Sequence, residues 1–228
     1  MRMFERRQLV TPGELLAEGD YIAGENTYKE DNKIYSQKLG LVDFDDKKVF
    51  VVPLRGKYIP KVGDVVIGQI SDVSLNGWSV DINSPYKAIL SVSDVTGKAF
   101  SPKLDSLTKI LGIGEIVIGK ITAFDRSRDP TLTIKGSGLG RVSDGLIVNL
   151  TPTKVPRLIG RKGSMINILK RETGCEIVVG QNGRILILGK NPKKVELAVK
   201  AIKMIEEQAH ISGLTDRIKS FLRAGRGE

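Results

Sequence analysis

Residues 159–166 read Ile-Gly-Arg-Lys-Gly-Ser-Met-Ile, and this stretch decides how the last third of the chain folds. Gly160 and Gly163 enclose two cations, Arg161 and Lys162. Because glycine has no Cβ, it adopts turn angles that other residues avoid and lets a ligand approach the backbone closely. The amides of a helix that follows would add hydrogen-bond donors to the two positive charges. The stretch therefore has the composition of a turn that holds phosphate groups.

The segments around this turn alternate between the residue spacings of strands and of helices. We predict six elements in the order strand, helix, helix, strand, strand, helix, at about 146–150, 152–159, 164–173, 176–179, 184–188 and from 191 onward. Asn182-Gly183, between the two adjacent strands, is the strongest short signal for a hairpin turn. This order, with a G-x-x-G turn between the first two helices, resembles that of a KH domain.

A KH domain clamps the backbone of about four nucleotides with its G-x-x-G loop. The resemblance implies an α+β domain of order βααββα over residues 141–210. It also implies RNA contacts at the loop and at the first residue of the next helix, namely Gly160, Arg161, Lys162, Gly163 and Ser164. An ordinary connection between two helices is the alternative interpretation. The basic tail, 211–228, fits either a helix that packs on a neighbour or a solvated end.

Positive charge is concentrated in the same part of the chain. The 228 residues have a net charge of +10, and residues 141–228 hold 17 basic and 8 acidic side chains, which leaves a net charge of only +1 on residues 1–140. One strongly basic segment is typical of nucleic-acid binding. The nearly neutral remainder can pack against protein.

Five short strand-like segments separated by glycine-rich turns lie between residues 63 and 135, at about 65–70, 77–82, 88–92, 115–121 and 131–135. Five such strands predict a small closed barrel of the OB-fold type over residues 61–137. In the second strand Trp78, Val80 and Ile82 alternate with Ser79 and Asp81. We therefore expect Trp78 to face the barrel core and Ser79 to face outward.

The barrel segment resembles the OB-fold RNA-binding domain first described in the largest protein of the bacterial small ribosomal subunit. Residues 62–65, 77–82, 88–95 and 113–115 carry the resemblance. Typical members of that family have a stacking aromatic where Ser79 stands and often a histidine where Ser91 stands. Because both are serines here, we expect weak base selectivity. The candidate RNA contacts on the barrel are Ser79 and Ser91, Tyr86 as the stacking candidate, and the cations Lys120, Arg126 and Arg128.

The first 60 residues are predicted to form a separate strand-rich domain. Pro12-Gly13 marks a tight turn, and residues 50–54 are a continuous apolar stretch. The whole chain is thus predicted to be multidomain, mainly β at first and then α+β.

Several kinds of chemistry are excluded or not expected. The longest apolar runs have four residues, far fewer than the roughly 20 of a membrane span. The charged start at residues 1–10 does not resemble a secretory signal, so we expect a cytoplasmic protein. One cysteine, Cys175, and one histidine exclude an internal disulfide and a cysteine-rich or histidine-based metal site. We expect no metal, no cofactor and no catalytic residue.

The order of the three domains resembles the KH-bearing, RNA-binding cap subunit of the archaeal RNA exosome. Residues 11–14, 81–86, 129–136 and the G-x-N-G sequence at 180–183 carry this resemblance. It implies a cap trimer, either of this subunit alone or mixed with a zinc-ribbon counterpart, on a hexameric ring of phosphorolytic subunits contacted by residues 1–60. Single-stranded RNA would be captured by the cap and fed to the ring 3′ end first, which increases RNA binding and degradation.

Two other classes of function remain open from the sequence. One is a free-standing RNA-binding or ribosome-associated protein, and the other is an RNA-degrading enzyme. The enzyme would need a carboxylate cluster or a phosphate-binding active site with an acid, and neither occurs with a recognisable spacing. The sequence therefore favours a non-catalytic, RNA-binding subunit.

Overall fold

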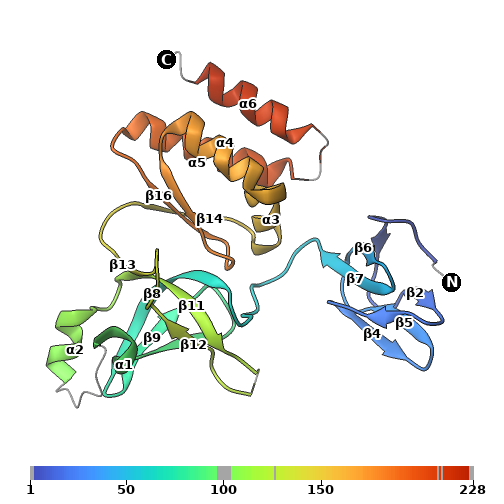
Figure 1. The fold of residues 1–228 in the computed structure, drawn as a ribbon, viewed down its shortest axis with the longest axis horizontal. Coiled ribbons are helices and arrows are strands. Elements are labelled where there is room, and N and C mark those ends of the chain that lie inside the picture. The colour runs from blue at the N-terminus through green and yellow to red at the C-terminus, as the bar shows by residue number, and fades with distance from the viewer. Residues whose placement is uncertain (1–2, 97–103, 126, 210, 212, 226–228) are drawn as a thin grey trace. The chain divides into compact units, whose positions relative to one another are not determined.

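A computed structural model describes residues 3–96, 104–125, 127–209, 211 and 213–225. The chain forms two compact units, Met1–Gly56 and Lys57–Glu228. Figure 1 shows both units as ribbons with their elements labelled. In the described part of the chain no helix has the length and apolar character needed to cross a membrane.

The first unit consists of strands, as the sequence predicts. Its four-stranded sheet has the order β1-β6-β7-β3, with bounds Leu9–Val10, Gly40–Asp45, Lys48–Pro53 and Ile22–Ala23. Its three-stranded sheet has the order β2-β5-β4, with bounds Leu15–Glu18, Lys33–Ser36 and Thr27–Glu30. Fully buried side chains from both sheets form one core: Val10, Leu16, Ala17, Ile34, Val42 and Val49.

The second unit begins with the predicted five-stranded barrel. Its strands are β8 (Val65–Ser74), β9 (Gly77–Asp81), β10 (Lys87–Ser91), β11 (Ile116–Ala123) and β12 (Thr131–Thr133). They are ordered β12-β10-β9-β8-β11, and pairing of β11 with β12 closes the barrel. Three short elements complete it: α1 (Val92–Thr96), α2 (Leu104–Ile110) and β13 (Gly140–Val142), which pairs with β11.

The alternation in β9 has the predicted sense. Trp78 is 1% exposed, and its indole Nε1 donates a hydrogen bond to the Leu111 carbonyl oxygen at 2.8 Å. The core position of Trp78 is therefore confirmed. Strand β8 extends past its predicted end at residue 70. After a register shift between Ile70 and Asp72, the residues up to Ser74 still pair with β9.

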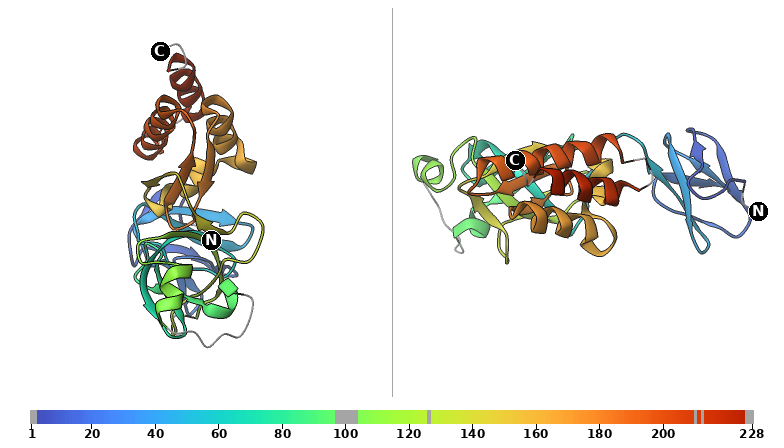
Figure 2. Two further views of the ribbon diagram at one scale, coloured as in Figure 1. Left: turned by 90° about the vertical axis from the view of Figure 1, so that its left-hand side faces the viewer. Right: turned by 90° about the horizontal axis from the view of Figure 1, so that it is seen from above.

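The KH elements follow in the predicted order. They are β14 (Leu146–Asn149), α3 (Val155–Ile159), α4 (Ser164–Thr173), β15 (Glu176–Val179), β16 (Arg184–Leu188) and α5 (Pro192–Glu207), with 3-10 turns at Pro152–Lys154 and Arg161–Gly163. The sheet has the order β14-β16-β15. Figure 2 shows the helices, coloured orange to red, on one face of this sheet.

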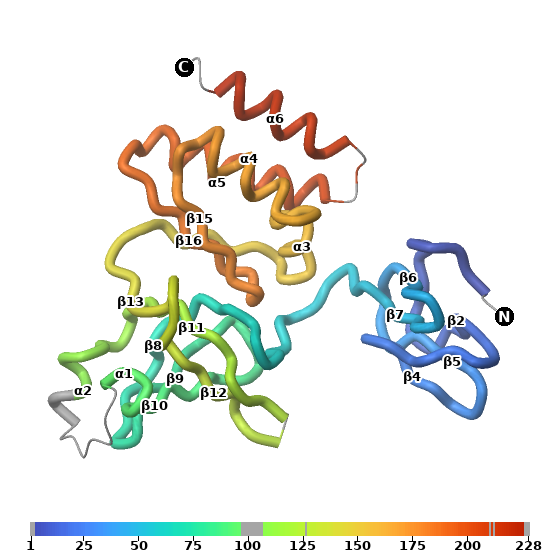
Figure 3. The backbone as a smooth tube through the Cα atoms, in the orientation of Figure 1, coloured from blue at the N-terminus to red at the C-terminus, as the bar shows by residue number. Residues whose placement is uncertain are grey.

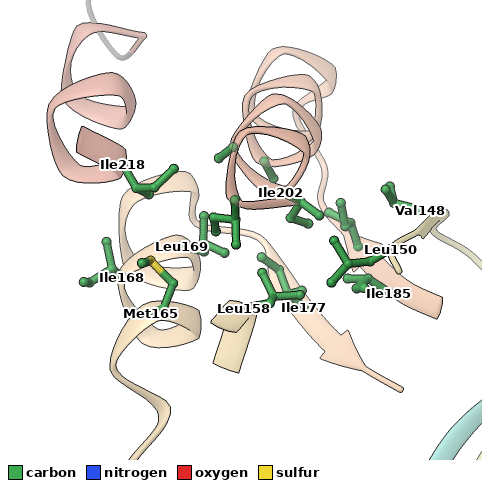
Figure 4. Close-up of a cluster of buried hydrophobic side chains, with 14 of the residues drawn as sticks. Val148, Leu150, Leu158, Met165, Ile168, Leu169, Ile177, Ile185, Ile202 and Ile218 are labelled. Carbon is green, nitrogen blue, oxygen red and sulfur yellow. The ribbon is translucent and has the colours of Figure 1, made fainter. Parts of the chain in front are cut away.

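One further helix, α6 (Leu214–Ala224), extends this domain. Leu214, Ile218 and Leu222 are buried in the same core as α4 and α5, part of which Figure 4 shows. Of the two interpretations of the tail, a packed helix is therefore correct. Cys175 also lies in this core, 4% exposed, as a small buried residue.

The other face of the KH sheet packs against the barrel. The buried side chains Ile67 from β8, Ile118 from β11 and Leu186 from β16 form an apolar cluster that joins the two domains. Ile67 and Ile118 project from the outer surface of the barrel, where alternate residues of β8 and β11 would otherwise meet solvent. Part of the barrel's outer face is thus covered by protein.

Hydrogen bonds and an ion pair from the hairpin between β15 and β16 stabilise this contact. Figure 3 shows the hairpin turn next to the barrel. The Asn182 side chain is completely buried, and its Nδ2 donates to the carbonyl oxygens of Ile67 (2.8 Å) and Ile82 (2.9 Å). Asn83 Nδ2 donates to the Asn182 carbonyl oxygen at 2.9 Å. Arg184 forms an ion pair with Asp81. The G-x-N-G sequence therefore does more than make a hairpin, because it fixes the KH domain to the barrel.

Candidate nucleic-acid interface

The predicted G-x-x-G turn lies between the end of α3 and the start of α4. Gly160 and Gly163 have φ angles of 74° and 77°, in the region that strains other residues. A Cβ on Gly160 would lie 2.8 Å from the backbone nitrogen of Met165, closer than real Cβ contacts. Glycine at this position is therefore required by the start of α4, and the turn presents backbone with little side chain above it.

The two cations of the turn are available to a ligand. Arg161 and Lys162 are exposed, and neither pairs with an acidic side chain among the residues described. Lys162 has φ 51° and ψ 33°, a left-handed conformation that costs a non-glycine residue about 1 kcal/mol. Ser164, also exposed, is the first residue of α4. The structure thus brings together the five residues that the sequence assigns to this loop.

Apolar side chains lie on the elements beside the turn. Ile159 is the last residue of α3, Ile166 lies in the first turn of α4, and Val179 is the last residue of β15, each half-buried against the KH core. Strand β15 is an edge strand, and α4 packs on it. Cations at the turn and an apolar floor next to it suit a single nucleic-acid strand, whose phosphates and bases need different surfaces.

On the barrel, Ser79 and Ser91 share one outward face. Ser79 pairs with Ile89 in the neighbouring strand, and Ser91, two residues beyond Ile89, pairs with Gly77. The Ser91 hydroxyl donates to Asp94 Oδ2 at 2.8 Å. The side chain between the two serines is Ile89, which is 47% exposed. This face therefore presents the Ile89 side chain and two hydroxyl groups, and positions 79 and 91 hold serine rather than an aromatic residue.

Tyr86 is not a freely exposed ring. It is half-buried and lies edge-on against Phe124, with ring centroids 4.9 Å apart and an interplanar angle of 72°. Phe124, the first residue after β11, was not among the residues expected from the sequence. Its position in the loop before the last barrel strand could have identified it, because OB-folds bind ligands with that loop. Two aromatic rings, one from each of two loops, therefore meet here.

The predicted barrel cations are spread over two elements. Lys120 is exposed on β11, opposite Thr133 of β12, and Arg128 is exposed in the loop between these strands. The Arg128 amide donates to Asp125 Oδ1 at 3.1 Å. Hydrogen bonds from the Ser127 hydroxyl and amide hold the pKa of the Asp125 carboxyl below its usual value. Arg126, also expected here, lies outside the described residues.

Three stretches of the chain match models of known families. Residues 7–55 match the exosome RNA-binding protein RRP4 N-terminal domain, residues 57–103 match the RRP4 S1 domain, and residues 146–204 match the KH domain. These stretches correspond to the first unit, to the first part of the barrel and to the elements from β14 to α5.

Two curated relatives that match nearly the whole chain are both named exosome complex component Rrp4. The exosome complex component Rrp4 of Sulfurisphaera tokodaii is 49% identical over 228 residues, 99% of this chain and 92% of its own. That of Thermofilum pendens is 45% identical over 219 residues, 95% of this chain and 92% of its own. A crystal structure of a candidate exosome complex RNA-binding protein has a TM-score of 0.71 and 48% identity, covering 75% of this chain and 98% of its own. The chain belongs to the Rrp4 family of exosome complex components.

Proposed function

We propose that this chain is a non-catalytic, RNA-binding cap subunit of the exosome. It holds single-stranded RNA and delivers the 3′ end to a ring of phosphorolytic subunits, in the cytoplasm. The observation that carries the RNA-binding part is the G-x-x-G turn, whose two exposed cations pair with no acidic side chain in the described part of the chain and lie beside half-buried apolar residues. The exosome part rests on relatives of nearly full length that carry the exosome component name. These relatives give no support to a free-standing or ribosome-associated protein.

Binding at the turn follows from its geometry. Phosphate oxygens approach the backbone at Gly160 and Gly163, where no side chain keeps them away, and Arg161 and Lys162 supply the opposite charge. Bases then lie over Ile159, Ile166 and Val179. Such a site gains most of its affinity from charge and discriminates little among sequences.

The first unit is suited to docking on the ring. Leu9, Leu41 and Val52 are direct neighbours across β1, β6 and β7, on the face of the sheet opposite the core. Leu9 is 54% exposed and Val52 is 44% exposed. Leu41 is half-buried, and Ile22 of β3 adds a third exposed apolar side chain to this sheet. Contiguous apolar side chains on a surface are typical of protein interfaces, so we assign ring contact to this apolar sheet face.

Co-purification tests the assembly. Aspartate at Leu9 and Val52 should abolish recovery of the ring subunits with this chain, alone or as a mixed cap trimer, and should leave RNA affinity unchanged. Leu75→Asp is a matched control, because Leu75 is 66% exposed and directly follows β8, in the other unit. Recovery of an intact complex with the double variant would exclude the apolar sheet face as the docking surface.

A nuclease assay tests the catalytic part. The pure chain, incubated with labelled RNA, a divalent metal and phosphate, should leave the RNA intact, and the ring should degrade the same RNA faster when the chain is bound to it. Shortening of the RNA by the pure chain would overturn the non-catalytic assignment.

A further inference from the structure

The second sheet of the first unit has an outer face that takes no part in the core. Strands β2, β5 and β4 form this sheet, and its inner face contributes Leu16, Ala17 and Ile34 to the core (Figure 1). Successive side chains of a strand point to opposite faces of the sheet. Tyr35, which follows the buried Ile34, therefore points outward, and so does Tyr28, which lies opposite Tyr35.

Three of these outward side chains form a row across the sheet. Leu15 lies opposite Tyr35, and Tyr35 lies opposite Tyr28, so the row crosses all three strands. The two tyrosine rings are stacked, with centroids 5.4 Å apart and an interplanar angle of 21°. Tyr28 is nevertheless 37% exposed. The face thus presents an aromatic ring that is held in a fixed orientation by its neighbour and is still accessible.

The next row on the same face carries charge. Glu18 lies opposite Lys33, and Lys33 lies opposite Glu30, so two carboxylates flank one ammonium group. Glu30 is exposed and stands two residues after Tyr28, on the same side of β4. Residues 14–36, which contain the whole sheet, hold six acidic and two basic side chains, a net charge of −4 in a chain of +10. The tyrosine rings therefore lie in the acidic part of a basic protein.

We propose that this outer face binds an arginine-bearing segment of a second protein, a partner additional to those of the proposed function. A guanidinium group stacks on the Tyr28 ring and forms an ion pair with the Glu30 carboxylate. RNA does not suit this face, because the carboxylates of Glu18 and Glu30 repel phosphates. The ring of the proposed function is assigned to the apolar sheet face, where Leu9 and Val52 belong to the other sheet.

Binding of a defined peptide to the full chain tests this proposal. The probe is a short labelled peptide in which arginine alternates with serine, and the same peptide with lysine in place of arginine is its control. The lysine peptide should bind about threefold more weakly, because an ammonium group lacks the planar face that stacks on a ring. Tyr28→Ala should weaken binding of the arginine peptide about threefold. Tyr28→Phe should bind it like the parent, because the ring is kept.

A charge reversal separates this face from the acidic character of the unit as a whole. Glu30→Lys replaces an exposed side chain and should weaken binding of the arginine peptide about fivefold. Asp45→Lys is the matched control, because Asp45 is exposed on β6, in the other sheet of the same unit. Equal losses in Glu30→Lys and Asp45→Lys would overturn the proposal, since net charge would then explain the binding.

Three further results would overturn the proposal. The first is the lack of saturable binding to the parent, or unchanged binding by folded Tyr28→Ala and Glu30→Lys, in which case the tyrosine pair only stabilises the sheet. The second is a loss of RNA affinity in Tyr28→Ala, which would make this face a nucleic-acid surface. The third is a loss of co-purifying ring subunits in Tyr28→Ala, which would make it part of the ring contact. The proposal expects RNA affinity and ring recovery to be unchanged.

Discussion

The turn at Gly160–Gly163 and the aromatic pair Tyr86–Phe124 have different surfaces, and we expect them to contact RNA in different ways. The turn has two exposed cations, on a backbone that only glycine can form at its first position. The aromatic pair is half-buried, and Phe124 packs against the barrel core. Charge attracts every phosphate from a distance and weakens with salt, whereas stacking acts at contact and depends little on salt. We therefore expect RNA binding at the KH turn and RNA binding at the barrel to respond differently to salt.

The largest expected effect comes from breaking the link between the two regions. Asn182→Ala removes the donor to two buried carbonyl oxygens, at Ile67 and Ile82, and should cost about 2 to 4 kcal/mol of unfolding free energy. The chain contains two local probes, because Trp78 is buried in the barrel core and Cys175 in the KH core. Urea unfolding followed by Trp78 fluorescence and by Cys175 thiol labelling should give one midpoint in the parent and two in the variant.

Asn167→Ala is the control for this experiment, because Asn167 is exposed on α4, and it should change stability by less than about 0.5 kcal/mol. Coincident midpoints in Asn182→Ala would show that the apolar contact alone holds the two domains together.

The next prediction tests whether RNA binding depends on the two cations of the turn or only on the net charge of the domain. Aspartate at both Arg161 and Lys162 should weaken RNA binding by at least tenfold, because two attractive charges become repulsive. The same change at Lys190 and Lys194 is a matched control. Both are exposed, and Lys194 lies near Gly174, just after the end of α4 that is remote from the turn. Equal losses in the two double variants would mean that net charge, rather than this turn, binds RNA.

Salt dependence then distinguishes the turn from the aromatic pair. Each phosphate contact on a single strand contributes about 0.7 to the slope of log affinity against log salt. Neutral glutamine at Arg161 and Lys162 should therefore lower the slope by about 1.4, while Tyr86→Ala should lower RNA affinity without changing the slope. A change of slope in Tyr86→Ala would indicate that the ring acts by positioning cations such as Arg128.

The smallest expected effect concerns strain in the turn. Lys162→Gly should raise the unfolding free energy of the KH domain by about 0.5 to 1 kcal/mol, because Lys162 has a left-handed conformation that glycine adopts freely. RNA binding should fall, since one cation is lost. Lys170→Gly, within α4, should instead lower the stability by about 1 kcal/mol. A loss of stability in Lys162→Gly would show that the Lys162 side chain makes contacts that stabilise the folded domain.

Local signals explain why much of the KH domain could be predicted from the sequence. The predicted bounds 164–173, 176–179 and 184–188 coincide with α4, β15 and β16. Glycine, proline and the Asn-Gly turn act within a few residues and mark these ends directly. The five residues of the turn lie together for the same reason, since they are consecutive.

Contacts between distant residues explain what could not be predicted. Asn182 was recognised as part of a hairpin, but its hydrogen bonds reach Ile67, 115 residues away. Phe124 gained its significance only from Tyr86, in another loop. The tail remained open between two interpretations because Leu214, Ile218 and Leu222 indicate an apolar helix face without showing what covers it. In each case the partner, rather than the local pattern, decides the role.

The most direct test of RNA binding at the turn observes its amides. We would titrate the isotopically labelled full chain with a single-stranded RNA of about four nucleotides and follow backbone amide resonances. The account predicts saturable shifts at Gly160, Gly163 and Ser164, with none at Gly13 in the first unit. Saturable shifts elsewhere, with the turn unchanged, would contradict the assignment of the G-x-x-G turn as the RNA clamp.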